Sequence, residues 1–216
     1  MVRAPKPTTS AADFLPAGRL SIESLRAAAA GCRGCDLWQR GTQTVFGEGQ
    51  PRARIVFVGE QPGDQEDLRG RPFVGPAGAV LDRALEEAKL ARESLYVTNA
   101  VKHFKWIQRG KRRIHQKPVL GQVNACRPWL EAEIAVLKPE IIVALGATAA
   151  QSLLGKTFRL TQQRGEFFED SPWAPATVIA TLHPSAVLRM PDPATREEAY
   201  QGLVADLVKI KRRLAA

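Results

Sequence analysis

The sequence predicts an α/β protein, a three-layer α/β/α sandwich around a central four-stranded parallel sheet. Four short apolar runs, rich in Val and Ile and bounded by turn residues, are typical of buried strands and cover residues 54–60, 95–102, 140–146 and 176–184. Stretches with apolar residues at helical spacing alternate with these strands along the chain. Strands that alternate with helices form a parallel sheet with helices on both faces.

The first two predicted helices cover residues 76–90 and 122–138. The first has Pro76 in its first turn, where proline is tolerated, and apolar residues at helical spacing after it. The second contains Pro128, which lacks a backbone N–H and can interrupt a helix.

Two further helices are predicted over residues 147–155 and 195–216. The shorter one ends at Gly155. The longer one carries several cations at its C-terminal end, where the helix dipole stabilises positive charge.

Composition indicates a soluble globular chain with a polyanionic partner. The 216 residues are 44% hydrophobic and 25% charged, which suits one domain with a substantial core. The net charge of +9 favours nucleic acid as the partner, with charge for solubility as the alternative. No apolar run has the length of a membrane span, and no signal-peptide pattern is present, so we expect a cytoplasmic protein. We also expect a monomer. Residues 1–20 are expected to form a loose tail before a single domain over residues 21–214.

Polar residues follow the predicted strands at their carboxyl ends. In an open parallel sheet these ends meet at one edge, where ligands bind. The residues at this edge are Glu60, Asn99 followed by Lys102 and His103, Gly146, and His183.

The loop over residues 59–67, "GEQPGDQED", is rich in glycine and acids but has neither of the phosphate-binding glycine patterns. Its carboxylates suit a bound metal or a developing positive charge, and Mg²⁺ for phosphoryl chemistry is one alternative. We expect Glu60 to lie at the site and Glu66 to be solvated. Phe73, in the following Gly/Pro-rich loop, can stack on a planar base or can simply cover the core.

Asn99 lies inside an apolar strand, where a carboxamide must find hydrogen-bond partners. Its C=O can accept from uracil N3–H and its NH₂ can donate to O4, a pattern that cytosine reverses; nearby backbone is the alternative partner. His183, after the last strand, can donate to a ligand oxygen, although a lone histidine is more often structural.

Taken together, four motifs and the cysteine pattern resemble a known family. The sequence "GEQPG" at 59–63, "TNAVK" at 98–102 and "HPSAVLR" at 183–189 resembles the uracil-DNA glycosylase superfamily, close to its iron–sulfur branch. "GKRRIH" at 110–115 resembles specifically UdgX, the branch that becomes covalently linked to uracil-containing DNA. The resemblance extends from about residue 30 to residue 210.

The resemblance implies a role for each matching residue. It places uracil binding on Gln61, Phe73, Asn99 and His183, and catalysis on Glu60, Asp64, His115 and His183. Glu60 and Asp64 would surround the reacting sugar. The target nucleotide would enter the pocket from single-stranded DNA or after being flipped out of a duplex.

The three cysteines, Cys32, Cys35 and Cys126, are too few and odd in number for a disulfide framework. Their spacing alone leaves zinc and an iron–sulfur cluster open, and without the resemblance zinc is favoured. The resemblance implies that His103 completes a Cys₃His set around a structural 4Fe–4S cluster, which would staple the N-terminal segment to the region of Cys126.

A basic segment follows the second strand, with seven Lys or Arg and no acid between residues 102 and 117. We expect this loop to lie along a DNA backbone. The residues expected to contact DNA are Lys102, Lys105, Arg109, Lys111, Arg112, Arg113, Lys117, Ser185 and Arg189.

His115 ends the basic run and can reach the same edge of the sheet. A neutral imidazole beside a sugar cation can attack C1′ before water does, and an N-alkylated imidazole is a poor leaving group. The hypothesis is a glycosylase that is consumed by its substrate, with Glu60 accepting the imidazole proton. The alternatives are that His115 only supplements phosphate contacts, that the chain is a conventional multiple-turnover glycosylase, or that it is a DNA-binding module with a structural metal and no chemistry.

Overall fold

The computed structural model describes residues 10–215 and contains one six-stranded sheet. The strand order is β1-β3-β2-β6-β8-β7. Four central strands run parallel to one another: β3 (Tyr96–Asn99), β2 (Ile55–Gly59), β6 (Ile141–Leu145) and β8 (Thr177–Thr181). The predicted four-stranded parallel sheet is therefore confirmed, and two short antiparallel edge strands, β1 (Glu48–Gly49) and β7 (Phe167–Phe168), extend it.

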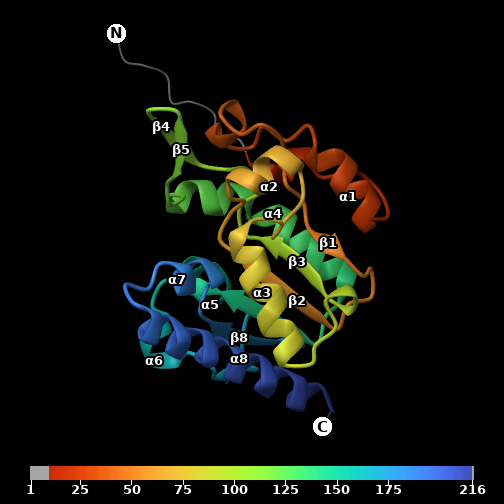
Figure 1. Cartoon of the computed structure of the whole chain (residues 1–216). Coiled ribbons are helices and arrows are strands. Elements are labelled where there is room, and N and C mark those ends of the chain that lie inside the picture. The colour runs from red at the N-terminus through yellow and green to blue at the C-terminus, as the bar shows by residue number, and fades with distance from the viewer. Residues whose placement is uncertain (1–9, 216) are drawn as a thin grey trace.

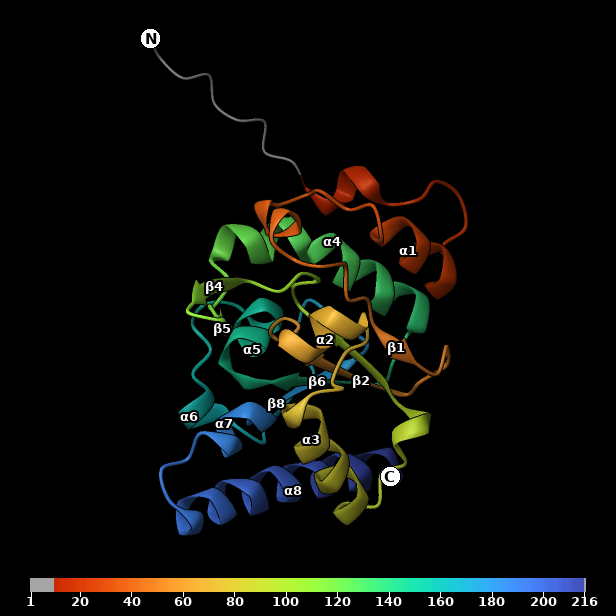
Figure 2. The ribbon, with the colours of Figure 1, turned by 45° about the horizontal axis from the view of Figure 1, so that its top comes forward.

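Helices cover both faces of the sheet, which confirms the predicted three layers (Figures 1 and 2). One face packs on α3 (Pro76–Glu87), α7 (Pro184–Leu188) and α8 (Pro193–Ala215), and the other on α4 (Leu120–Leu137) and α5 (Gly146–Leu154). β2 shows the division clearly. Its Ile55 and Phe57 belong to the core that includes α3, whereas Val56 and Val58 belong to the core that includes α4. Such a strand is apolar on both faces, and this explains its continuous apolar run.

The remaining elements are short. They are α1 (Ile22–Ala29), α2 (Asp64–Arg69), α6 (Leu160–Gln163) and the 3-10 helices η1 (Ala11–Phe14), η2 (Asp36–Gln39) and η3 (Arg92–Ser94). Within residues 10–215, none of the helices combines the length and the apolar character needed to span a bilayer.

Pro128 lies inside α4 without ending the helix, so the prediction that it could interrupt this helix is wrong. Proline removes one backbone hydrogen bond, but tertiary packing outweighs that loss when the neighbouring side chains are buried. Trp129 and Leu130, which follow directly, are 0% and 1% exposed.

The segment before α1 is folded where the structure describes it. Ser10 and Asp13 form a capping box at η1, and Ala11 is completely buried in a third core cluster together with Leu25 and Trp129. The prediction of a loose tail is therefore wrong for residues 10–20, and residues 1–9 lie outside the described part.

The basic segment forms a hairpin, β4 (Trp106–Arg109) and β5 (Arg112–His115), where only a loop was predicted. Trp106 pairs with His115 and Arg109 with Arg112, so two residues connect the strands. Gly110 is the first of these and has a φ of 58°, a conformation that suits glycine in a two-residue turn. In Figure 1 the hairpin projects beyond the main sheet, beside the N-terminal elements.

Packing of η1 against the Cys32–Cys35 segment gives a test of the folded N-terminal region. A Cβ at Gly34 would lie 2.5 Å from the backbone N of Ala11, whereas one at Gly31 would have its nearest neighbour at 3.9 Å. We expect Gly34→Ala to lower the free energy of unfolding by about 1–3 kcal/mol, because backbone must shift. Gly31→Ala, the matched control, should change it by less than about 0.5 kcal/mol. Equal thermal unfolding midpoints for the two variants would contradict the packing described.

Candidate active site

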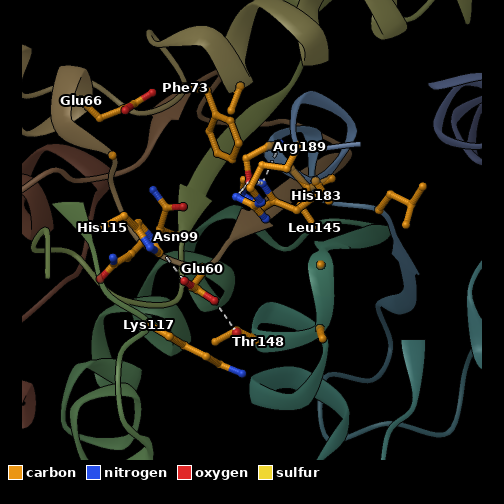
Figure 3. A pocket seen from close by; sticks show the side chains of 18 of the residues that line it. Glu60, Glu66, Phe73, Asn99, His115, Lys117, Leu145, Thr148, His183 and Arg189 are labelled. Atoms are coloured by element: carbon orange, nitrogen blue, oxygen red, sulfur yellow. Dashed lines mark hydrogen bonds and ion pairs between the residues drawn. The ribbon is translucent and has the colours of Figure 1, made fainter. Parts of the chain in front are cut away.

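A cavity of about 430 Å³ opens at the carboxyl edge of the parallel strands, large enough for a nucleobase. Glu60 follows β2, Asn99 ends β3, Thr148 lies in the first turn of α5 after β6, and His183 follows β8. His115 reaches the same cavity from β5. Figure 3 shows these side chains around one space. The convergence of strand ends predicted from the sequence is present.

Glu60 lies between two hydrogen-bond partners. Nε2 of His115 is 3.3 Å from Glu60 Oε1, and the hydroxyl of Thr148 donates to Glu60 Oε2. Burial opposes ionisation of this carboxyl, but the hydrogen bonds from His115 and Thr148 outweigh burial and lower the pKa of Glu60 below its usual value. An ionised carboxylate therefore faces an imidazole that is 49% exposed.

His183 is fixed in one tautomer. Its Nδ1 accepts the backbone N–H of Ser185 at 3.1 Å and lies 2.8 Å from Ser185 Oγ. Burial lowers the pKa of His183 to about 4, so the ring is neutral at neutral pH. Because Nδ1 is the acceptor, the proton of the neutral ring is on Nε2, which is available as a donor to a ligand.

Phe73 is held in a backbone conformation that is rare for its type, with a φ of 55°. Its ring is stacked near His183, with the centroids 6.3 Å apart, and it lines the cavity while also belonging to the core. Glu66 supports this loop, because its Oε1 accepts the N–H of Gly75 at 2.8 Å. The prediction of a solvated Glu66 is wrong: the side chain is 8% exposed and lines the cavity.

Asn99 is 3% exposed and lines the cavity. Among residues 10–215, every fully buried side-chain N or O atom has a hydrogen-bond partner, whereas the Asn99 carboxamide has none. The carboxamide atoms are therefore not fully buried. The carboxamide is therefore open to the cavity rather than satisfied by nearby backbone. Gly59 leaves room for it, since a Cβ there would lie 2.3 Å from Asn99 Oδ1.

Gln61 also lines the cavity, but its carboxamide is used elsewhere. Its Nε2 donates to the carbonyls of Lys105 and Gln116 at 3.3 and 3.0 Å, and its Oε1 accepts the N–H of Lys105 at 3.1 Å. Gln61 thus closes the base of the hairpin, and its role in uracil binding stays a prediction.

Asp64 and Arg113 form an ion pair with each other. Arg113 donates to Asp64 Oδ1 and to Asp67 Oδ2, each at 2.6 Å, and Asp67 is completely buried. Asp64 is not among the residues that line the cavity. The expected placement of Asp64 beside the sugar and of Arg113 on phosphate is therefore corrected. These ion pairs also oppose the Mg²⁺ alternative, since the acids are already neutralised.

Lys102 is 1% exposed and forms an ion pair with Glu133, which is 0% exposed. The expectation that Lys102 contacts DNA is wrong, because its side chain is buried against Glu133 before the hairpin begins. Lys105 is half-buried. The other predicted cations are exposed: Arg109, Lys111, Arg112, Lys117 and Arg189. Lys117, Ser185 and Arg189 line the cavity.

Thr148 was not predicted. It follows the third parallel strand, and the same rule that selected Glu60 and Asn99 could have found it. Its hydroxyl is the second partner of Glu60.

The four candidate metal ligands share one region. Cys32 and Cys126 are buried thiols, Cys35 is half-buried, and all three belong to or pack against the third core cluster. Cys126 Sγ accepts the backbone N–H of Lys102 and Cys32 Sγ the indole N–H of Trp129, each at 3.2 Å. Donors of this kind stabilise thiolates, and burial otherwise raises the pKa of the Cys126 thiol to about 12.

His103 is 5% exposed, and burial lowers its pKa to about 4. Its Nε2 lies 3.0 Å from Thr44 Oγ1, and the Thr44 hydroxyl donates to the Ala29 carbonyl, so Nε2 is the donor and Nδ1 has the lone pair. Across residues 10–215, no three His, Cys, Asp or Glu side chains converge closely enough to hold a single metal ion. The donor types, three thiols and one imidazole, fit either a zinc site or an iron–sulfur cluster.

The environment of His183 gives a pH prediction. With its pKa lowered from 6.5 to about 4, the folded ring stays neutral where an unfolded histidine takes up a proton. Its contribution to stability is therefore complete above pH 6.5 and is lost as the pH falls towards 4. In ¹⁵N NMR we expect His183 to show the Nε2–H tautomer and no titration near its ordinary pKa, whereas the urea-unfolded chain titrates at about 6.5. A folded-state midpoint near the ordinary value would contradict this environment.

Comparisons with known proteins agree with this geometry. The family model of the uracil DNA glycosylase superfamily matches residues 46–207. The chain is 41% identical over 160 residues to a type-4 uracil-DNA glycosylase of Thermotoga maritima, covering 73% of this chain and 78% of the relative. It is 36% identical over 181 residues to the type-4 enzyme of Sulfurisphaera tokodaii (80% and 78%) and 37% identical over 172 residues to that of Archaeoglobus fulgidus (77% and 82%). The chain therefore belongs to the uracil-DNA glycosylase superfamily.

Proposed function

We propose that this protein is an enzyme that removes uracil from DNA and then remains joined to the abasic sugar through His115. Family membership and the type-4 glycosylase relatives support the excision of uracil. One observation carries the covalent step: His115 Nε2 lies 3.3 Å from Glu60 Oε1, at the cavity that Phe73, Asn99 and His183 also line.

Uracil would be recognised by hydrogen bonds and stacking. The unpartnered Asn99 carboxamide can accept from N3–H and donate to O4, and Nε2–H of His183 can donate to O2. Cytosine reverses the pattern at the Asn99 edge, and a site built on such bonds can reject the wrong base by about 10⁴-fold. Phe73 supplies the stacking surface. The volume of about 430 Å³ suits a single flipped-out base.

Cleavage of the C1′–N1 bond sends its electron pair to uracil N1 and leaves positive charge on the sugar. Neutral donors at His183 and Asn99 stabilise the uracil anion, and the Glu60 carboxylate stabilises the sugar cation. The lone-pair nitrogen of His115 then forms a bond to C1′. The alkylated ring becomes an imidazolium, and passing its remaining N–H proton to a carboxylate such as Glu60 returns it to neutrality.

Cys32, Cys35, His103 and Cys126 would hold a 4Fe–4S cluster, whose contribution is structural: it joins the N-terminal segment to α4. The type-4 relatives support a cluster over zinc, since Cys₃His donors alone suit either metal site. Exposed cations on the hairpin would bind the DNA backbone, and the protein would act as a monomer.

The adduct is the first prediction from this proposal. Incubation with a uracil-containing oligonucleotide should give a protein–DNA species that survives boiling in detergent, and a thymine-containing oligonucleotide should give none. His115→Ala should abolish the species, because the imidazole that would attack C1′ is then missing. Lys211→Ala, which removes an exposed cation on α8, should leave the yield unchanged.

Three outcomes would favour the alternatives. A cross-link that persists in His115→Ala would exclude His115 as the nucleophile. Uracil released in excess over enzyme without an adduct would establish ordinary turnover. Binding that ignores uracil and releases no base would indicate a DNA-binding module without chemistry.

The exposed hairpin cations should set the salt dependence of DNA binding. Replacing Arg109, Lys111 and Arg112 by Gln should reduce the slope of log K against log salt by about 2 for single-stranded DNA, at about 0.7 per lost phosphate contact. The same number of substitutions on α8, at Lys209, Lys211 and Arg212, should leave the slope unchanged. Equal slopes for the two triple variants would show that the hairpin does not lie on the DNA.

Metal analysis distinguishes the cofactors. A 4Fe–4S cluster predicts a brown protein with about four iron atoms per chain. A colourless protein with zinc and no iron would establish zinc at the same residues.

A further inference from the structure

A buried ion pair lies behind the cavity. Lys102 and Glu133 are 1% and 0% exposed. Two such charges are costly to remove from water, and apolar residues of similar size at such positions often give equal or greater stability. Stability alone therefore gives no reason for an ammonium group here, and its hydrogen bonds indicate a different role.

The ammonium group of Lys102 holds the end of β3. Nζ donates to the backbone carbonyl of Asn99 at 2.8 Å and lies 2.6 Å from Thr98 Oγ1, besides its contact with Glu133. Asn99 has its carboxamide in the cavity, so the lysine fixes the backbone from which that carboxamide projects.

The residues between Asn99 and Lys102 hold the neighbouring wall of the cavity. Ala100 N–H donates to the Gly59 carbonyl at 2.9 Å, and Val101 N–H donates to the Glu60 carbonyl at 3.0 Å. The backbone N–H of Lys102 donates to Cys126 Sγ at 3.2 Å. One four-residue turn thus joins Asn99, Glu60 and a candidate metal ligand.

Glu133 anchors the ammonium from α4. Its Oε1 accepts the Tyr96 hydroxyl at 2.8 Å and the Gly47 N–H at 3.1 Å, and both its oxygens lie 3.0 Å from Thr98 Oγ1. Because these donors hold the carboxylate in place, the carboxylate in turn fixes the position of Lys102 Nζ.

We infer that Lys102, held by Glu133, is a positioning residue that sets the Asn99 carboxamide for discrimination between uracil and other bases. The inference rests on the proposed function, because it assigns to Asn99 the recognition of uracil. Misplacement of a recognition group by about 1 Å can lower a rate by about 100-fold, so loss of this support should affect selectivity more than DNA binding.

The test separates positioning from stability. Lys102→Met leaves Glu133 buried and unpaired, so it should lower the thermal unfolding midpoint. The double variant Lys102→Met/Glu133→Leu removes both charges and should recover most of that midpoint. Lys209→Met is the matched control, because Lys209 pairs with Asp206 at 3.6 Å but is 50% exposed and lies on α8.

In single-turnover assays on uracil- and cytosine-containing oligonucleotides, we expect the double variant to lose about 10- to 100-fold in uracil excision relative to wild type, with unchanged DNA affinity. Binding of free uracil should weaken in parallel. A double variant with wild-type excision, selectivity and uracil affinity would overturn the inference.

A readout independent of activity is the Asn99 side-chain amide in ¹⁵N NMR of the holo-protein. Its signals should shift and broaden in the double variant and stay unchanged in Lys209→Met; an unchanged Asn99 amide in the double variant would overturn the inference. If wild type excises no uracil, the proposed function fails, and the NMR comparison still decides whether Lys102 positions Asn99.

Discussion

The ion pairs of Arg113 with Asp64 and Asp67 determine where the proposed nucleophile lies. His115 comes from outside the main sheet, and its strand, β5, pairs only with β4 among the described strands. Two bonds of 2.6 Å from Arg113, two residues earlier on β5, fix that ribbon to α2. Because Asp67 is completely buried, the pair that it forms with Arg113 is less screened than a surface pair. Cation–π contacts of Arg113 with Phe104 and Trp106 add to them.

The cavity then presents different chemistry to the base and to the sugar. Neutral donors, His183 Nε2–H and the Asn99 amide, can meet the negative charge that leaves with uracil. The ionised Glu60, held by Thr148, can meet the positive charge that remains. In the proposed reaction, this separation of unlike charges in a site of fixed dipoles would lower the barrier, since the groups need little reorganisation. In that proposal, His115 would act on the sugar after the base has separated.

The parallel sheet and its catalytic edge could be predicted because both depend on local patterns. Strands buried on both faces give continuous apolar runs, and topology brings the residues after them, such as Glu60, Asn99 and His183, to one edge. The edge strands β1 and β7 have two residues each and show no periodicity. The hairpin was missed because its strands are mostly exposed and cationic.

The errors at single residues share a physical cause. Lys102, Arg113 and Glu66 were judged from the exposure that charged residues usually have, and each is buried or half-buried because a partner far away in sequence neutralises or hydrogen-bonds it. Sequence patterns report neighbours along the chain, whereas these partners lie between 9 and 49 residues away. The contacts of the Gln61 amide with the hairpin could not be predicted for the same reason, because Lys105 and Gln116 lie 44 and 55 residues away.

The separate pairing of β4 and β5 makes the turn of the ribbon exchangeable. The backbone ladder of the ribbon is self-contained, and the ribbon is attached through Arg113 and through the contact of Gln61 with Gln116 at its base. At its turn, a Cβ on Gly110 would meet no other atom within 4 Å, so the tip is free of packing constraints. Turns of other lengths or sequences could therefore be grafted between Arg109 and Arg112 while the Arg113 ion pairs and the register of the parallel strands stay in place. The protein would then be a scaffold for redesigning what is delivered to the mouth of a nucleobase pocket.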